Sequence, residues 1–176
     1  KWESFYSAFN GATNLTIPAT DEPDLSLTTS MELAFTSCTS LVGTTLNDWN
    51  VSTINNMRNM FQNATAFNQN IGNWNVSNVT NMEGMFESAK AFNQDIGNWN
   101  IASVTNIRSM FAGANSFNQD IGNWDVSSVT NMGFVFQNVG SFNQDIGNWN
   151  TGAVTAIDSM FEGAAAFNGD IGNWNT

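Results

Sequence analysis

The residues of this chain that could do chemistry are carboxylates and amides that recur at a fixed interval. Aspartates stand 25 residues apart at Asp95, Asp120, Asp145 and Asp170, with Asn70 opening the row. Glutamines precede this row at Gln69, Gln94, Gln119 and Gln144. A row of oxygen ligands could bind Ca²⁺, which takes many oxygens, or a polar ligand. A pair of carboxylates could also hydrolyse glycosides.

The pattern of this row favours binding over catalysis. The aspartates of the row stand in equivalent surroundings, so none of them is set apart as a general acid or a general base. We therefore expect that the chain is not an enzyme. Four carboxylates in a row repel each other unless something compensates. Screening by solvent together with hydrogen bonds from backbone N–H groups could offset this repulsion. A weakly bound Ca²⁺ could also offset it. The chain has no Asp-x-Asp-x-Asp-Gly loop and no Gly-Gly-x-Gly-x-Asp nonapeptide, so no metal ligand is assigned.

The composition of the chain excludes several kinds of catalytic site, metal site and partner. The chain has no histidine and one cysteine, Cys38, which excludes His-dependent triads and ordinary zinc sites. Cys38 is therefore expected to be a small buried residue. With 15 acidic and 4 basic residues and a net charge of −11, the chain is not expected to bind nucleic acid or an anionic membrane. No apolar run is long enough to span a membrane.

The carboxylates belong to a repeat. The tryptophans recur every 25 residues, at Trp49, Trp74, Trp99, Trp124, Trp149 and Trp174. Such a period indicates a solenoid of stacked supersecondary units. Residues 31–176 are predicted to hold about six repeats, truncated at the C-terminus. Residues 1–30 are predicted to be a degenerate N-terminal capping repeat, because Phe5, Phe9, Ala12 and Leu15 follow the spacing of the later repeats.

Each repeat shows two periodicities. From Val79, apolar residues recur at offsets typical of one face of a short helix, namely Met82, Met85, Phe86 and Ala89. Thr80 and Glu83 fit a capping box, and Thr105, Thr130 and Thr155 recur as expected N-caps. Asp95 to Gly97 alternates outward and inward, as in a short strand. The expected fold class is therefore α/β, a leucine-rich-repeat-like solenoid with one short parallel strand and one short helix per repeat.

Other recurring positions have structural interpretations. The tryptophans are expected to fill the core. Two asparagine columns are expected to bond internally, each amide accepting from one neighbour and donating to the next. They comprise Asn68, Asn93, Asn118, Asn143 and Asn168, and Asn73, Asn98, Asn123, Asn148 and Asn173. Phe134 is an aromatic residue where other copies are small or polar, and it is either a ligand contact or packed against a neighbour.

Val79 to Phe86 followed by Phe92 to Ile101 resembles a repeat of bacterial surface proteins. The family is that of the BspA-like leucine-rich-repeat proteins, together with the related repeats of mycoplasma-type lipoproteins. The resemblance implies a leucine-rich-repeat solenoid in a secreted or cell-surface protein, often one implicated in adhesion. It carries no catalytic residue. Phe, Ile, Trp, Val and Met occupy positions where leucine is commoner in that family.

We therefore expect a non-enzymatic extracellular or cell-surface module for adhesion or ligand binding. Its partner would be an extracellular protein or a polysaccharide. A passive spacer that displays another domain and a weak Ca²⁺-binding ladder along the aspartates are the alternatives. The predicted ligand contacts are Gln69, Gln94, Gln119, Gln144, Asp95, Asp120, Asp145, Asp170 and Phe134.

Overall fold

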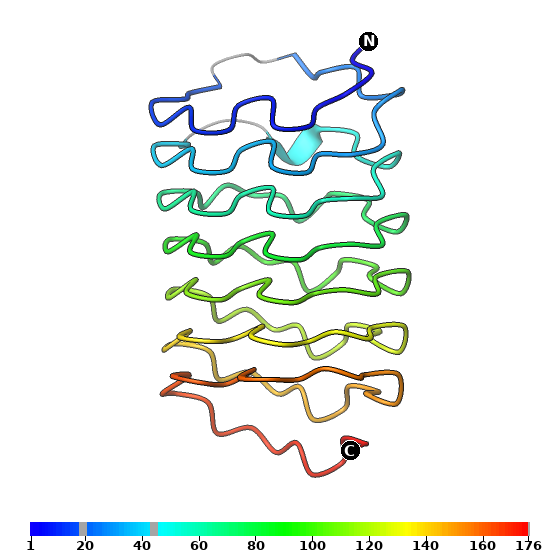
Figure 1. The fold of residues 1–176 in the computed structure, drawn as a ribbon, viewed down its shortest axis with the longest axis vertical. Helices are drawn as coiled ribbons and strands as arrows, with labels where there is room; N and C mark the ends of the chain where they lie inside the picture. Colours follow the sequence, from blue (N-terminus) through cyan, green and yellow to red (C-terminus); the bar gives the residue numbers. More distant parts are fainter. Residues whose placement is uncertain (18–20, 43–45, 176) are drawn as a thin grey trace.

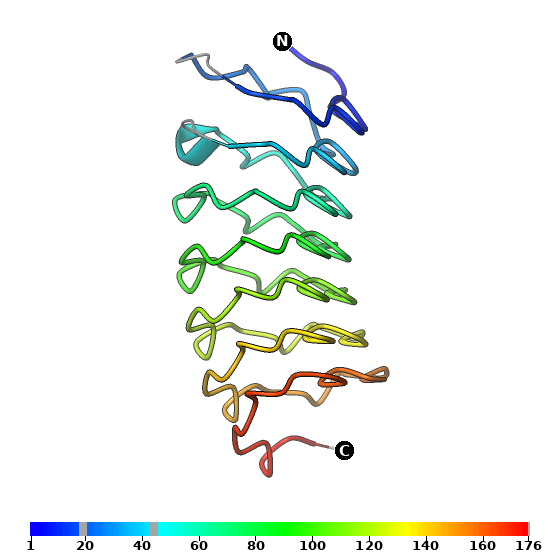
Figure 2. The same ribbon diagram turned by 90° about the vertical axis from the view of Figure 1, so that its left-hand side faces the viewer.

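The protein is a stack of similar coils. A computed structural model describes residues 1–17, 21–42 and 46–175. Each repeat makes one flat coil, and the coils lie on one another along the long axis, with the two chain ends at opposite ends of the stack (Figure 1). In each coil a zigzag segment, such as residues 81–89, forms a front layer. A second segment, such as residues 93–100, forms a rear layer behind it (Figures 1 and 2).

The predicted helix and strand of each repeat are wrong. Within the described residues, the helical element is a single 3-10 turn, η1, over Leu46–Asp48. No β-sheet is formed in those ranges, where parallel pairing is limited to isolated bridges along one column: Ser30, Asn56, Asn81, Asn106, Asn131 and Ala156. The α/β leucine-rich-repeat solenoid expected from the sequence is therefore not the fold of this chain.

Backbone hydrogen bonding explains why the zigzag segment is not a helix. Along residues 57–63, every second N–H donates to the next coil: those of Met57, Asn59 and Phe61 reach the carbonyls of Asn81, Glu83 and Met85. Between them, the N–H groups of Met60 and Gln62 donate to carbonyls three residues back in their own coil, those of Met57 and Asn59. The N–H of Arg58 donates to Oδ1 of Asn56, also in its own coil. An α-helix needs consecutive bonds to the fourth residue back. Overlapping turns therefore generate an apolar spacing that resembles a helical one.

Backbone conformation also excludes the helix. Two positions of each zigzag segment are left-handed, as at Asn59 with φ 53° and Asn63 with φ 58°. Glycine adopts this conformation readily and occupies it at Gly84 and Gly113. A right-handed helix cannot continue through such residues. These two positions therefore redirect the chain in every coil.

The threonines predicted as N-caps have a different role. The side chain of Thr80 donates 3.2 Å to the carbonyl of Asn55 in the preceding coil. The backbone N–H of Thr80 donates to the same carbonyl at 2.8 Å. Thr105, Thr130 and Thr155 repeat the side-chain bond, each to the carbonyl 25 residues earlier. Since no helix begins there, the capping prediction is wrong, and the threonines join coil to coil.

Aromatic side chains fill the core between the layers. Phe86 stacks on Phe92 of its own coil at 3.9 Å between ring centroids, and on Phe61 and Phe111 of the adjoining coils at 5.8 Å. The six repeat tryptophans, from Trp49 to Trp174, are 3–8% exposed, which confirms the prediction that they are core residues. From Trp74 onward each indole N–H donates to a backbone carbonyl 28 residues earlier. Each tryptophan therefore both fills its coil and joins it to the preceding one.

Cys38 is buried, as predicted. Its sulfur lies 3.0 Å from the carbonyl oxygen of Phe9. Burial raises the pKa of the Cys38 thiol, which keeps it protonated and unreactive. It occupies the small-residue position that Ala64 and Ala89 take in later coils.

Glycine in the rear layer allows a close approach between coils. A Cβ atom at Gly122 would lie closer than 3.0 Å to the backbone carbonyl oxygen of Asp145. We therefore expect Gly122→Ala to lower the free energy of unfolding by about 1–3 kcal/mol, the usual effect of overpacking. Gly140→Ala is the matched control, because no atom lies within 4 Å of its added Cβ. Urea unfolding followed by tryptophan fluorescence measures both, and equal effects would contradict the close approach.

Candidate functional site

One asparagine column of the rear layer forms the predicted internal ladder. The backbone N–H of Asn93 donates to Oδ1 of Asn68 at 2.9 Å. Asn118, Asn143 and Asn168 repeat this bond, each to the asparagine 25 residues earlier. The side-chain oxygen thus satisfies a backbone donor of the next coil, and internal bonding is confirmed for this column.

The glutamines lie against that ladder. Nε2 of Gln119 donates to the carbonyl oxygen of Asn93 at 3.0 Å and to its Oδ1 at 2.9 Å. Gln144 makes the same two bonds to Asn118, and Gln94 makes one, to Oδ1 of Asn68. These three predicted ligand contacts are half-buried and already join coils.

Gln69 differs from the other three glutamines. It is 8% exposed, and neither atom of its amide has a hydrogen-bond partner within the described residues. Its equivalents bond to an asparagine, but the preceding coil carries Val42 in that column. The first coil to contain the motif therefore buries an amide without the oxygen that it would otherwise bond.

The predicted aspartate contacts form an exposed row on the rear layer. Oδ1 of Asp95 accepts the N–H of Gly97 at 2.9 Å. Asp120, Asp145 and Asp170 close the same turn. Asn70 closes it equally well, with Oδ1 2.9 Å from the N–H of Gly72. The turn therefore needs the oxygen and not the negative charge.

The second carboxylate oxygen of these aspartates makes no hydrogen bond or ion pair within residues 1–17, 21–42 and 46–175. In the same ranges no group of three or more His, Cys, Asp and Glu residues could hold a metal ion. Four free carboxylate oxygens thus face solvent in a regular row.

The second asparagine column lies three residues after the aspartates. Asn73, Asn98, Asn123, Asn148 and Asn173 are exposed. Their side chains form no hydrogen bond with other described residues, so the internal bonding predicted for this column is not found. The rear layer thus presents a row of free amides alongside its row of free carboxylates.

Asp125 shows the same turn chemistry at another column. Its Oδ1 accepts the hydroxyl of Ser127 at 2.6 Å and the backbone N–H of that residue at 3.0 Å. These bonds lower the pKa of Asp125, the side-chain bond most strongly. Asn75 forms the equivalent pair of bonds with Ser77, so an amide again replaces a carboxylate without loss of the turn.

Phe134 lies on the front layer beside an arginine. The guanidinium carbon of Arg108 is 4.4 Å from its ring centroid, a cation–π contact. Arg108 also reaches Asp158, two coils away in sequence, with Nη1 3.3 Å from Oδ2. It can do so because the intervening residue is Gly133, whose Cβ would lie 2.9 Å from both atoms. Phe134 itself has φ 62°, which is uncommon for a bulky residue.

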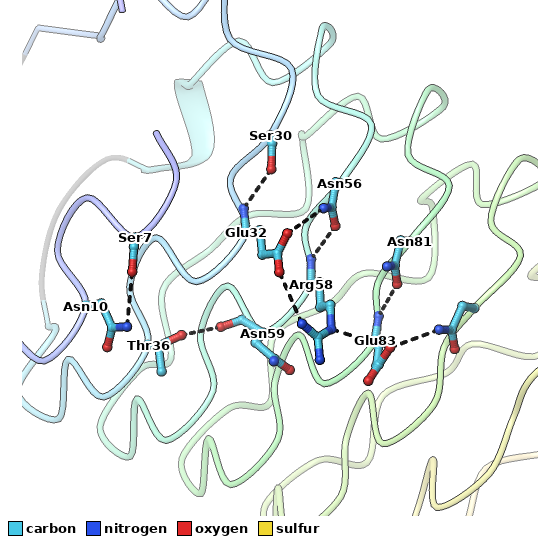
Figure 3. A network of polar contacts seen from close by, with 11 residues as sticks. Ser7, Asn10, Ser30, Glu32, Thr36, Asn56, Arg58, Asn59, Asn81 and Glu83 are labelled. Atoms are coloured by element: carbon cyan, nitrogen blue, oxygen red, sulfur yellow. Dashed lines mark hydrogen bonds and ion pairs between the residues drawn. The ribbon is translucent and has the colours of Figure 1, made fainter. Parts of the chain in front are cut away.

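An ion-pair network on the front layer was not predicted from the sequence. Nη1 of Arg58 lies 3.1 Å from Oε1 of Glu32, and its Nε lies 3.5 Å from Oε2 of Glu83 (Figure 3). The bond to Glu32 contributes most to raising the pKa of Arg58. The alternation of Glu32, Arg58, Glu83 and Arg108 in one column was the signal for it. Both arginines are therefore paired on the front layer, away from the aspartate row.

The comparisons with known proteins identify a family. The family described as "Mycoplasma protein of unknown function, DUF285" matches residues 3–106 and 94–176. The chain belongs to the DUF285 family. This fits the mycoplasma-type part of the resemblance, whereas the BspA-like leucine-rich-repeat part is not confirmed. No curated protein matches the chain.

Within residues 1–17, 21–42 and 46–175 of this DUF285 chain, no helix has the length and apolar character needed to span a membrane.

The contrast between two glutamines gives a test of the ladder. We expect Gln69→Leu to raise the free energy of unfolding by about 1 kcal/mol, because it removes a buried amide that has no hydrogen-bond partner among the described residues. Gln119→Leu should lower it by about 1 kcal/mol, because two bonds to Asn93 are lost. Chemical denaturation measures both variants. Stabilisation by both substitutions would show that glutamine is not needed in this column.

Proposed function

We propose that this chain is a non-enzymatic module that binds a repetitive ligand along its rear layer, outside the cell or at its surface. The observation that carries the proposal is the aspartate row. Asn70 closes the same turn as Asp95, with the same bond length of 2.9 Å. Folding alone therefore does not require four carboxylates there.

The charge of the row has an energetic cost. Like charges at equivalent positions of stacked segments repel each other, and asparagine would avoid that repulsion at no loss of turn geometry. In the part of the chain that the structure describes, none of these aspartates pairs with Lys or Arg. A ligand that carries positive charges at intervals would relieve the repulsion, which is a reason to retain the carboxylates.

The exposed amides extend this surface. Asn98 and Asn123 provide donors and acceptors next to the carboxylates of Asp95 and Asp120. Such a strip suits an amine-bearing polysaccharide or a basic segment of an extracellular protein. The extracellular or cell-surface setting is supported by the resemblance to mycoplasma-type lipoprotein repeats.

A passive spacer is the second candidate function. Stacked phenylalanine rings run from Phe9 to Phe161 without interruption. Each coil is also bonded to the next through its backbone. A continuous core of this kind could hold another domain away from a surface without binding any ligand itself.

A fourfold charge-removal variant tests the binding proposal. We expect the combination of Asp95→Asn, Asp120→Asn, Asp145→Asn and Asp170→Asn to fold normally, because Asn70 already closes this turn. Binding to immobilised chitosan or to a polylysine peptide should weaken by at least about tenfold, which corresponds to about 1.4 kcal/mol. Surface plasmon resonance measures the affinity, and circular dichroism measures the fold.

The matched control removes four charges elsewhere, at exposed residues, by Glu3→Gln, Asp21→Asn, Glu22→Gln and Glu162→Gln. It should bind like the unchanged chain. If the unchanged chain binds neither probe nor any member of a glycan and cell-surface panel, the binding proposal is overturned and the spacer function remains. A melting temperature raised by CaCl₂ and restored by EDTA would instead indicate a calcium ladder.

A further inference from the structure

One position of the front layer departs from the repeat. The first left-handed residue of each zigzag segment is small or polar in most coils, but at Phe134 it is aromatic, with φ 62°. Its equivalents are Ser7, Leu33, Asn59, Gly84, Ser109 and Ser159. A bulky side chain is disfavoured in this conformation, whereas asparagine and glycine adopt it more readily. Phe134 therefore stands where a smaller residue would cause less strain, and such outliers are a reason to look for a binding role.

The residue before Phe134 also departs from the repeat. Gly133 stands in the column that holds a charged residue in the neighbouring coils, namely Glu32, Arg58, Glu83, Arg108 and Asp158. Because Gly133 has no side chain, the guanidinium of Arg108 occupies that space and lies 4.4 Å from the centroid of the Phe134 ring. Arg108 and Phe134 both belong to inner coils, with further described coils on either side.

Arg108 retains hydrogen-bond donors for a ligand. Its Nη1 lies 3.3 Å from Oδ2 of Asp158, whereas its Nε and Nη2 make no hydrogen bond or ion pair within residues 1–17, 21–42 and 46–175. Arg58, by contrast, pairs with Glu32 through Nη1 and with Glu83 through Nε. The side chain of Arg108 is 37% exposed, and Phe134 is half-buried. Ion pairs and cation–π contacts at such exposed sites add little to stability, so they offer little in return for the strained conformation of Phe134.

We propose that Phe134 and Arg108 bind one neutral sugar residue on the front layer. The apolar C–H face of the sugar ring packs on the accessible part of the Phe134 ring, and Nε and Nη2 of Arg108 donate to the sugar hydroxyls. Charge selects a neutral ligand, because the net charge of −11 repels polyanions and the guanidinium repels cations. This site does not depend on the aspartate row, which lies on the rear layer.

The arginine side chains give a direct test of this site. Arg58 and Arg108 are the two arginines of the chain, so an NMR spectrum of isotope-labelled protein shows one Nε–H signal for each. The Arg108→Lys variant assigns the two signals. The probes are cellobiose, lactose and diacetylchitobiose at millimolar concentration, because so few contacts give weak binding. We expect at least one probe to shift the Arg108 signal saturably and to leave the Arg58 signal in place.

Substitutions at Phe134 separate ring packing from simple contact with the guanidinium. Phe134→Ser should fold normally, because Ser109 and Ser159 stand at the equivalent position, and it should lose the sugar-dependent shift. Phe134→Tyr keeps the ring and should keep the shift, as should the fourfold aspartate variant. The proposal is wrong if no probe shifts the Arg108 signal, or if Phe134→Ser responds like the unchanged chain. It is also wrong if removing the four aspartates abolishes the shift, because the sugar would then bind at the rear layer.

Discussion

The structure depends on how the front layer divides its backbone N–H groups. Alternate groups close turns within the coil, and the groups between them bond to the next coil. In the inner coils this division satisfies the N–H groups of the front layer, although the described residues contain almost no regular secondary structure. It also requires left-handed residues at two positions per coil, which is why Asn, Ser and Gly recur there. The spacing between successive coils is therefore set along the front layer by these backbone bonds.

Part of this arrangement could be predicted from the sequence. The 25-residue period of the tryptophans reports the coil length, and the burial of Trp99 and Phe92 follows from it. The helix could not be excluded by periodicity, because overlapping three-residue turns place Met82, Met85 and Phe86 inward just as a helix would. The signal against it was local: Gly84 and Ser88 stand at the left-handed positions of what would have been the helix.

The sequence predicted that the aspartates lie on the outside, and they do. It also placed the glutamines among the ligand contacts, but their side chains bond to the asparagine ladder. Periodicity alone does not show which polar column bonds to its own neighbours. Gln69 and Gln94 look identical in sequence. They differ in the residue that the preceding coil offers. Gln94 bonds to Asn68, whereas the equivalent residue before Gln69 is Val42, which has no side-chain oxygen. Side-chain bonds between coils depend on two repeats at once, so one motif read alone does not reveal them.

Equivalent positions of successive repeats show which residue properties the fold requires. Glycine at the Gly122 position is required because a backbone carbonyl of the next coil occupies the space of a side chain. An oxygen is required at the Asp95 position, yet a charge is not, since Asn70 serves there. The front layer pairs three of its acids, Glu32, Glu83 and Asp158, with arginines of other coils. The rear layer does not, and its uncompensated charge is the feature that folding leaves unexplained.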